Sequence, residues 1–344
     1  MPGPDTPDGP GAPEARGAQG LDPLPRLVGE ATAEGRPVDP GTIEISAVAS
    51  GPETRRRRGF GVTGWLSIGW LVLVTGLALL APILPIDDPN EIITSIARKG
   101  PLADAGSAPG HPLGGDYNGR DMLSRLIWGG RTTLFVSITA VLIGLLVGGL
   151  LGLLGGYFRG KVDVVVSLLL DVLLAIPAVI LALALVTILR EDPSNPGAGG
   201  LSPETALILA IGFVSIPVLG RITRASALSW SEREFVLAAR AQGARHRRII
   251  VREVLPNVVP AMTSIALLSV GVAIVAEGTL SILGASVEAS TPTWGNMIAI
   301  GRINLQRAPY MVFEPALMIF FTVLALNMLG DVIRARFDVR EGAL

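Results

Sequence analysis

The sequence predicts an all-α integral membrane protein with six transmembrane helices and both termini in the cytoplasm. The chain of 344 residues is 49% hydrophobic and only 17% charged, whereas a soluble domain is about 25% charged. Its mean hydropathy is +0.54. Six segments approach the roughly 20 apolar residues that a helix needs to cross a bilayer. We expect these spans at residues 63–84, 132–157, 163–189, 203–220, 257–284 and 312–335.

The chain divides by composition into two terminal tails and a membrane part. Residues 1–58 are rich in Pro, Gly, Ala and acidic residues and lack apolar periodicity, so we expect a disordered cytoplasmic tail. Residues 59–131 should hold the first transmembrane helix and an external segment. Residues 132–336 should form a five-helix core, and residues 337–344 a second cytoplasmic tail.

The distribution of Lys and Arg determines the predicted orientation. Most of the 28 basic residues fall in the N-terminal tail, which includes Arg55 to Arg58, in the turn at 158–162, in the segment 221–256 and at the C-terminal end. The connections at 85–131 and 285–311 carry far fewer. By the positive-inside rule, the first group is cytoplasmic and the second external. The chain should therefore be a multi-pass membrane protein in contact with lipid.

The second span has a glycine at every fourth position, which places these glycines on one helix face. Small residues at this spacing let two helices pack backbone to backbone. The pattern favours tight packing inside the bundle over a dedicated dimer interface. The glycines are Gly144, Gly148, Gly152 and Gly156.

Enzyme chemistry and metal binding find little support in this sequence. It has no cysteine, and its two histidines, His111 and His246, have no partner at ligand spacing. The run from Gly155 to Val162 nearly matches a phosphate-binding loop, but it lacks the terminal Ser or Thr and follows a membrane span rather than a strand. We therefore expect no catalytic residue, no metal site and no ATP site in this chain.

Two carboxylates lie inside predicted spans, Asp171 in the third and Glu277 in the fifth. A charge at this depth is costly and usually faces protein or a water-filled path. Each is either a pathway or gate residue or a carboxylate hydrogen-bonded between helices, and the second reading is favoured for Asp171. Pro177 and Pro217 should kink their helices.

One long basic segment, residues 231–257, lies between apolar spans. Ser231 and Glu234 have the spacing of a capping box, which predicts that a helix begins there. Gly243 should follow the end of this helix in a left-handed conformation. A second helix should then run to Pro256. The segment therefore predicts a rigid elbow on the cytoplasmic side.

The same segment resembles the "EAA" coupling motif of ABC importer permeases, in which A-A-x-x-x-G is followed after eleven residues by L-P. Leu237 stands where the family has Glu, and Glu253 stands at a usually apolar position. The matching residues are Ala238, Ala239, Gly243, Leu255 and Pro256.

Two further stretches are similar to dipeptide/oligopeptide permeases, in particular to their C-type subunit. Residues 111–125 resemble the family segment HPLGTD-x-x-GRD-x-LSR, and residues 277–302 resemble E-x-x-LS-x-LG followed by P-x-WG. The resemblance covers about residues 60–340 and implies the type I ABC importer permease fold. The motif residues of the external segments are Asp116, Arg120, Asp121, Arg125 and Trp294. They would either contact a binding protein or tie down the outer loop.

The resemblance also implies partners and a mechanism. A second, homologous permease would complete the pathway, two ATPase subunits or a fused ATPase would bind ATP and Mg, and an external binding protein would deliver the solute. No nucleic acid is expected, and the membrane would be the plasma membrane of a prokaryote. The residues implied in coupling to the ATPase are Glu234, Phe235, Ala238, Ala239, Arg240, Gly243 and Pro256.

Import of di- or oligopeptides is therefore the predicted function. Relatives in this family also carry nickel complexes or glutathione-like compounds, so these solutes remain alternatives. A hypothesis from another class is an ion-coupled secondary transporter with Asp171 or Glu277 as the ion carrier. That class is built on inverted repeats and broken helix pairs, which the sequence does not display.

Overall fold

The computed structural model describes residues 61–101, 110–191, 199–288 and 290–341, with side chains to residue 335. The predicted N-terminal tail at 1–58 lies outside the described residues, as do residues 342–344 of the predicted C-terminal tail at 337–344; residues 337–341 belong to the last helix. Throughout the described ranges the regular structure is helical, apart from two isolated β-bridges, Gly115 with Asp121 and Arg190 with Leu201. The bundle is all-α, as predicted.

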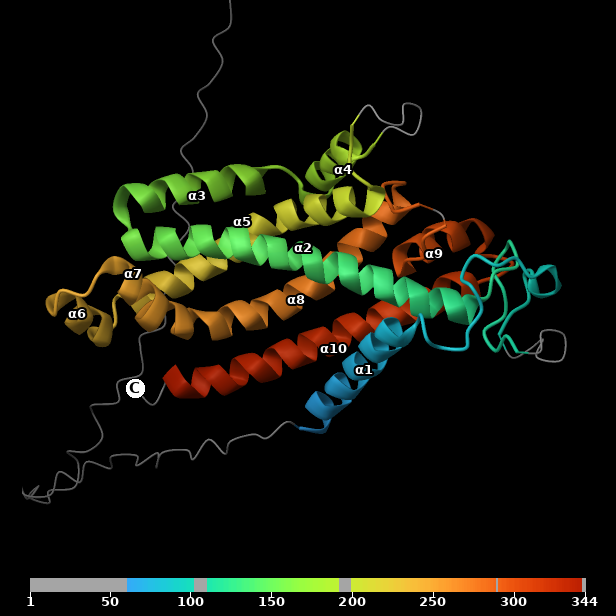
Figure 1. Ribbon diagram of the computed structural model, residues 1–344, viewed down its shortest axis with the longest axis horizontal. Coiled ribbons are helices and arrows are strands. Elements are labelled where there is room, and N and C mark those ends of the chain that lie inside the picture. The colour runs from blue at the N-terminus through green and yellow to red at the C-terminus, as the bar shows by residue number, and fades with distance from the viewer. Residues whose placement is uncertain (1–60, 102–109, 192–198, 289, 342–344) are drawn as a thin grey trace, which may run out of the picture. The chain divides into compact units, whose positions relative to one another are not determined.

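Two long helices, α2 (Met122–Phe158) and α5 (Pro203–Ser231), run side by side through the centre of the bundle (Figure 1). The glycine face of α2 packs directly on the backbone of α5. A Cβ added to Gly156 would lie 2.6 Å from the carbonyl oxygen of Arg224, and one added to Gly144 would lie 2.7 Å from Ser215 Cβ. Only glycine permits this approach, so the prediction of internal packing is confirmed.

The remaining long helices surround this pair. Helix α1 (Val62–Leu80) packs on α10 (Tyr310–Glu341), and α10 packs on α8 (Leu255–Ile282). At one end of the bundle the short helix α9 (Trp294–Gly301) packs on α8 and α10. At the other end lie α6 (Glu234–Ala241) and α7 (His246–Ile249) (Figure 1). These are called the α9 end and the α6 end below.

Within the described residues, five helices are long and apolar enough to cross a membrane, and a bent pair makes a sixth candidate. The pair is α3 (Gly160–Ala175) and α4 (Ala178–Leu189), whose axes differ by 88°. The break follows from Pro177, because the residue before a proline is pushed out of the helical region. Ile176 is accordingly extended, at φ −88° and ψ 128°. By contrast, α5 continues through Pro217 without a break.

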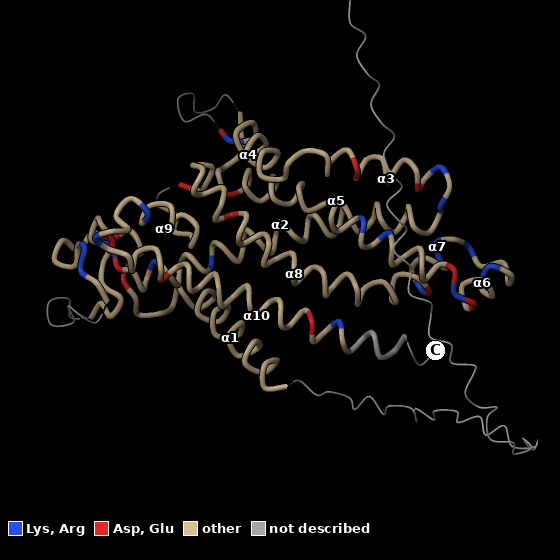
Figure 2. The backbone as a smooth tube through the Cα atoms, turned by 180° about the vertical axis from the view of Figure 1, so that it is seen from behind, with Lys and Arg blue, Asp and Glu red and all other residues tan. Residues whose placement is uncertain are grey.

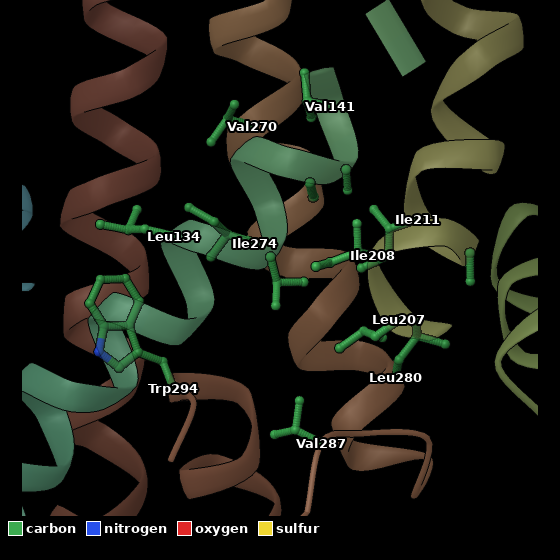
Figure 3. Packing of buried hydrophobic residues seen from close by; sticks show 14 of the residues in the cluster. Leu134, Val141, Leu207, Ile208, Ile211, Val270, Ile274, Leu280, Val287 and Trp294 are labelled. Atoms are coloured by element: carbon green, nitrogen blue, oxygen red, sulfur yellow. The ribbon is translucent and has the colours of Figure 1, made fainter. Parts of the chain in front are cut away.

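The apolar core lies between α2, α5 and α8 towards the α9 end (Figure 3). Trp294 is fully buried there. Its indole N–H donates to the carbonyl oxygen of Leu126 at 2.9 Å, and its backbone N–H donates to Thr133 Oγ1 at 3.1 Å. The sequence motif that contains Trp294 therefore anchors α9 to α2.

Candidate functional site

Helix α6 ends in a glycine turn that sets the direction of the chain. Gly243 has φ +78°, the left-handed conformation that the sequence predicted. Its N–H donates to the Arg240 carbonyl oxygen at 2.9 Å, and the N–H of Ala244 donates to the Ala239 carbonyl oxygen at 3.1 Å. These two bonds form a Schellman motif, which satisfies the last carbonyls of α6. The turn is therefore stiff.

Two boundaries predicted from the sequence were wrong. Ser231 does not cap a new helix, because it is the last residue of α5, and its hydroxyl donates to the Leu228 carbonyl oxygen at 2.9 Å. Pro256 does not end the second helix. Helix α7 passes through a π-helical segment, Ile250–Val254, straight into α8, and Pro256 lies in the first turn of α8. A proline at this position is compatible with a helix, so the elbow continues directly into a membrane-spanning helix.

Helix α6 packs on the bundle mainly through Val236 and leaves much of its surface exposed. Val236 is fully buried in an apolar cluster with Tyr157, Trp230 and Ile249. The neighbouring Leu237 is 51% exposed. The predicted coupling residues are exposed, except for Ala239, which is half-buried; they are Glu234, Phe235, Ala238, Ala239, Arg240, Gly243 and Pro256. A short helix with a small-residue patch and no cover suits docking by another protein.

The end of α2 holds the elbow in place, a contact that the sequence did not predict. The hydroxyl of Tyr157 lies 2.9 Å from His246 Nδ1, and the guanidinium of Arg240 lies 5.1 Å from the Tyr157 ring centre. Arg159 adds an ion pair with Glu232 at 2.7 Å. The sequence feature that could have indicated this contact is the run Tyr157-Phe158-Arg159, which directly follows the glycine face of α2. Charged residues gather around this end in Figure 2.

At the α9 end, the motif residues tie a loop to the start of α2. Asp116 accepts from Arg120 Nε at 2.7 Å, and Asp121 caps α2 by accepting from the backbone N–H of Ser124 at 2.7 Å. Arg125 is buried and donates to the carbonyl oxygen of Pro89 at 2.9 Å. These contacts favour loop fixation over contact with a partner.

His111 has close acidic neighbours that its sequence spacing did not reveal. Its Nδ1 lies 3.0 Å from Asp121 Oδ1 and 3.4 Å from Asp87 Oδ2. The three groups are close enough to share a cation. However, Asp121 also caps α2, and an Nδ1–H of His111 can donate to a neighbouring carboxylate, so the cluster fits a hydrogen-bonded tie for the loop.

Glu277 is fully buried rather than open to a pathway. Its Oε1 accepts from the hydroxyls of Ser281 at 2.9 Å and Thr293 at 2.7 Å. Ser281 belongs to α8, and Thr293 caps α9 by accepting from the N–H of Asn296. The carboxylate therefore joins α8 to the start of α9, which favours the structural reading.

Replacing Glu277 by alanine is expected to lower the apparent unfolding temperature of the purified subunit. The change leaves the buried hydroxyl of Thr293 without its acceptor, which costs about 1–3 kcal/mol, whereas the hydroxyl of Ser281 keeps Ser286 as a partner. Thermal unfolding in detergent measures the effect. Glu277→Gln keeps an acceptor oxygen and nearly the same volume, so it should lower the unfolding temperature much less. An unchanged unfolding temperature together with lost transport in Glu277→Ala would instead indicate a pathway role.

Asp171 has a different environment. Arg221 of α5 donates to its carboxylate at 2.6 Å, and the two side chains are 53% and 58% exposed. A second pair, Arg224 with Asp163, lies closer to the α6 end and is more buried, with Arg224 Nη2 at 2.7 Å from Asp163 Oδ2. Both pairs join α3 to α5. Asp171 is thus bonded between two helices, which is the arrangement that the sequence favoured for it.

Comparisons with known proteins agree with this architecture. Residues 140–341 match the family described as the inner membrane component of binding-protein-dependent transport systems. The dipeptide transport system permease protein DppC of Alkalihalophilus pseudofirmus is 36% identical over 276 residues, covering 79% of this chain and 85% of that protein. The glutathione transport system permease protein GsiD of Shigella flexneri is 34% identical over 283 residues, covering 82% and 87%.

A solved structure shows the same fold. The inward-facing MetNI methionine ABC transporter aligns with a TM-score of 0.52 at 18% identity, over 62% of this chain and 97% of that chain. The family match spans most of the helical bundle, including α6 and its glycine turn. The chain is a multi-pass membrane protein with the type I ABC importer permease fold, and it belongs to the family of inner membrane components of binding-protein-dependent transport systems.

Proposed function

We propose that this chain is a permease subunit of an ATP-driven importer of peptides in a prokaryotic plasma membrane. A second permease would complete the pathway, ATPase subunits or a fused ATPase would bind ATP and Mg, and an external binding protein would deliver the solute. The observation that carries the proposal is the exposed α6 helix with its small-residue patch, in a chain whose relatives include a dipeptide permease. The α6 end and both termini would be cytoplasmic.

Coupling would pass from the ATPase through α6 into α8. An ATPase that seats α6 in a groove can move it only together with the parts to which α6 is fixed. Val236 and Arg240 connect α6 to the end of α2, and the glycine turn at Gly243 connects it to α7. Because α7 continues into α8 through the π-segment, a rotation of the elbow moves a spanning helix. Nucleotide would thus bias a two-state element of rigid parts.

The solute is proposed to be a di- or oligopeptide. Glutathione-like compounds form the second candidate, because one relative is a glutathione permease, and nickel complexes form the third. An ion-coupled secondary transporter is the alternative from another class. Glu277 does not support the secondary transporter as its ion carrier, because its side chain is fully buried between α8 and α9.

Transport by the reconstituted complex tests the proposal. The chain, the permease and ATPases that copurify with it and the binding protein are placed in liposomes, and uptake of labelled dipeptide, glutathione and nickel chelate is followed. We expect dipeptide uptake that requires ATP and the binding protein and that persists when ionophores collapse all ion gradients. Uptake without ATP that ionophores abolish would establish the secondary transporter, and preferential uptake of another solute would overturn the peptide assignment.

A further inference from the structure

An open cleft of about 800 Å³ lies at the α9 end of the bundle. Ligand pockets typically measure about 300–1,000 Å³. The cleft is lined by one face of α2, from Trp128 to Thr139, by α1, by the first turn of α5 and by the connections at 88–90 and 290–292. Both connections belong to the segments that the distribution of Lys and Arg predicts to be external.

The α2 face of the cleft combines charge, hydroxyl groups and apolar surface. Its residues recur at intervals of three or four and therefore share one side of the helix. They are Trp128, Arg131, Thr132, Phe135, Ile138 and Thr139. Another side of α2 faces the interior of the bundle, where Val136 and Ser137 are fully buried. A solute in the cleft would thus meet a few polar partners beside an apolar wall, as in ligand pockets generally.

Arg131 is the cation of the cleft, and it is not engaged in an ion pair. Its side chain is exposed, and its guanidinium carbon lies 5.3 Å from the ring centre of Trp128. No carboxylate of the described residues lies within ion-pair distance of it. By contrast, Arg125 of the same helix is buried and bonded to the Pro89 carbonyl oxygen. The indole of Trp128 therefore supports a guanidinium whose N–H groups remain available to a carboxylate.

Two carboxylates line the same cleft, those of Asp88 and Glu204. Asp88 is already used locally, because one of its oxygens accepts from the backbone N–H of Asn90 at 2.7 Å. Glu204 is half-buried in the first turn of α5 and has no ion-pair partner in the part of the chain that the structure describes. The cleft thus offers a guanidinium and a carboxylate from two helices, and neither group neutralises the other.

This set of groups does not suit the second permease as the occupant. The core of a protein interface is depleted of charged residues, whereas more than half of the residues that line the cleft have polar or charged side chains. A small peptide supplies complementary groups, because it carries one ammonium, one carboxylate and amides between them. Charge complementarity therefore favours a peptide.

We propose that this cleft receives a peptide with free ends, whose carboxylate binds Arg131 and whose ammonium binds Glu204. The proposal rests on the peptide import proposed above, and in that orientation the cleft lies at the end where a binding protein would release the solute. Arg131 binds the carboxylate through two parallel N–H donors. Thr132 and Thr139 offer hydroxyl oxygens to the peptide amides. The cleft therefore favours zwitterionic solutes over solutes with a blocked end.

Protection of cysteines in the cleft is the first test. Because the full sequence contains no cysteine, each single-cysteine variant of this chain carries one thiol. Thr132→Cys and Thr139→Cys place the thiol in the cleft, and Ser137→Cys places it at a fully buried position of the same helix. The assembled transporter in nanodiscs is treated with a charged, membrane-impermeant thiol reagent, with and without dialanine.

We expect labelling at positions 132 and 139, slower labelling of both in the presence of dialanine, and no labelling at position 137. The reagent needs an accessible thiolate, which a buried position does not provide. Labelling that dialanine does not slow would overturn the proposal. A failure to label either cleft position without nucleotide, with ATP or with ADP would overturn it as well, because the second permease would then cover the cleft.

Discrimination between free and blocked peptides is the second test. In the Thr139→Cys background, Arg131→Gln is expected to raise the dialanine concentration that halves labelling by at least about tenfold, as for the loss of one charged hydrogen bond. The value for the C-terminal amide of dialanine should change little. Glu204→Gln should weaken protection by dialanine more than protection by its N-acetyl derivative.

Arg307→Gln is the matched control, because it removes an exposed cation in a predicted external connection but outside the cleft. It should leave protection by free and blocked peptides unchanged.

The outcomes separate the two proposals. Wild-type complex that imports no peptide in the liposome assay contradicts the proposed function. Wild-type import combined with equal shifts for free and blocked peptides in Arg131→Gln would show that Arg131 only shapes the cleft, which contradicts this inference alone.

Discussion

Gly243→Val is expected to abolish ATP-driven solute uptake while the subunit still assembles in the membrane. Gly243 adopts φ +78°, and nothing lies within 4 Å of the position where a Cβ would be added. The effect must therefore come from the backbone conformation rather than from a clash. A β-branched residue is strongly disfavoured at positive φ, so the turn should open and its two hydrogen bonds should be lost. Force from the ATPase would then no longer reach α7 and α8.

Uptake and ATP hydrolysis should be measured together in proteoliposomes. We expect hydrolysis to continue and uptake to fall by at least about tenfold, because the left-handed conformation costs a non-glycine residue about 1–2 kcal/mol and the turn should open instead. Gly243→Asn is the matched control, since asparagine tolerates the left-handed region, and should retain most uptake. Wild-type coupling in Gly243→Val would contradict a role of the turn in transmission.

Val236→Asp is the second change with a large expected effect. Val236 is the only fully buried side chain of α6 and anchors the helix in the cluster with Tyr157 and Trp230. Burying an unpaired carboxylate there is unfavourable by several kcal/mol, so α6 should detach from the bundle. Uptake should be lost, and the ATPase subunits should copurify less well with the chain.

Leu237→Glu provides the control for this prediction. It adds the same charge to the next residue of the same helix, but at a position that is 51% exposed. It also supplies the residue found there in the coupling motif that the segment resembles. We expect normal copurification and uptake. Equal losses in both variants would show that charge on α6, rather than detachment, is responsible.

The number and approximate limits of the spanning segments followed from hydropathy, because a bilayer requires a minimum apolar length regardless of packing. The break at Pro177 and the left-handed turn at Gly243 were also predictable, because both follow from the local chemistry of one residue. The glycine face of α2 was read correctly for the same reason, since its spacing alone places the glycines on one side.

Helix boundaries around the elbow were not predictable from local signals. The capping-box spacing at Ser231 does not start a helix, because Ser231 is the buried last residue of α5 and its hydroxyl bonds the Leu228 carbonyl oxygen. Pro256 lies in the first turn of α8, directly after the π-helical segment Ile250–Val254, and does not end the helix.

By itself, the sequence determined that this is a multi-pass helical membrane protein with a glycine-terminated elbow between two spans. These features depend on composition and on residues adjacent in the chain. Only the tertiary structure decided the surroundings of the two carboxylates that lie within predicted spans. Glu277 is sealed between α8 and α9, whereas Asp171 is paired with Arg221 on an open face. Hydropathy treats the two carboxylates alike, because burial and pairing depend on residues distant in the chain.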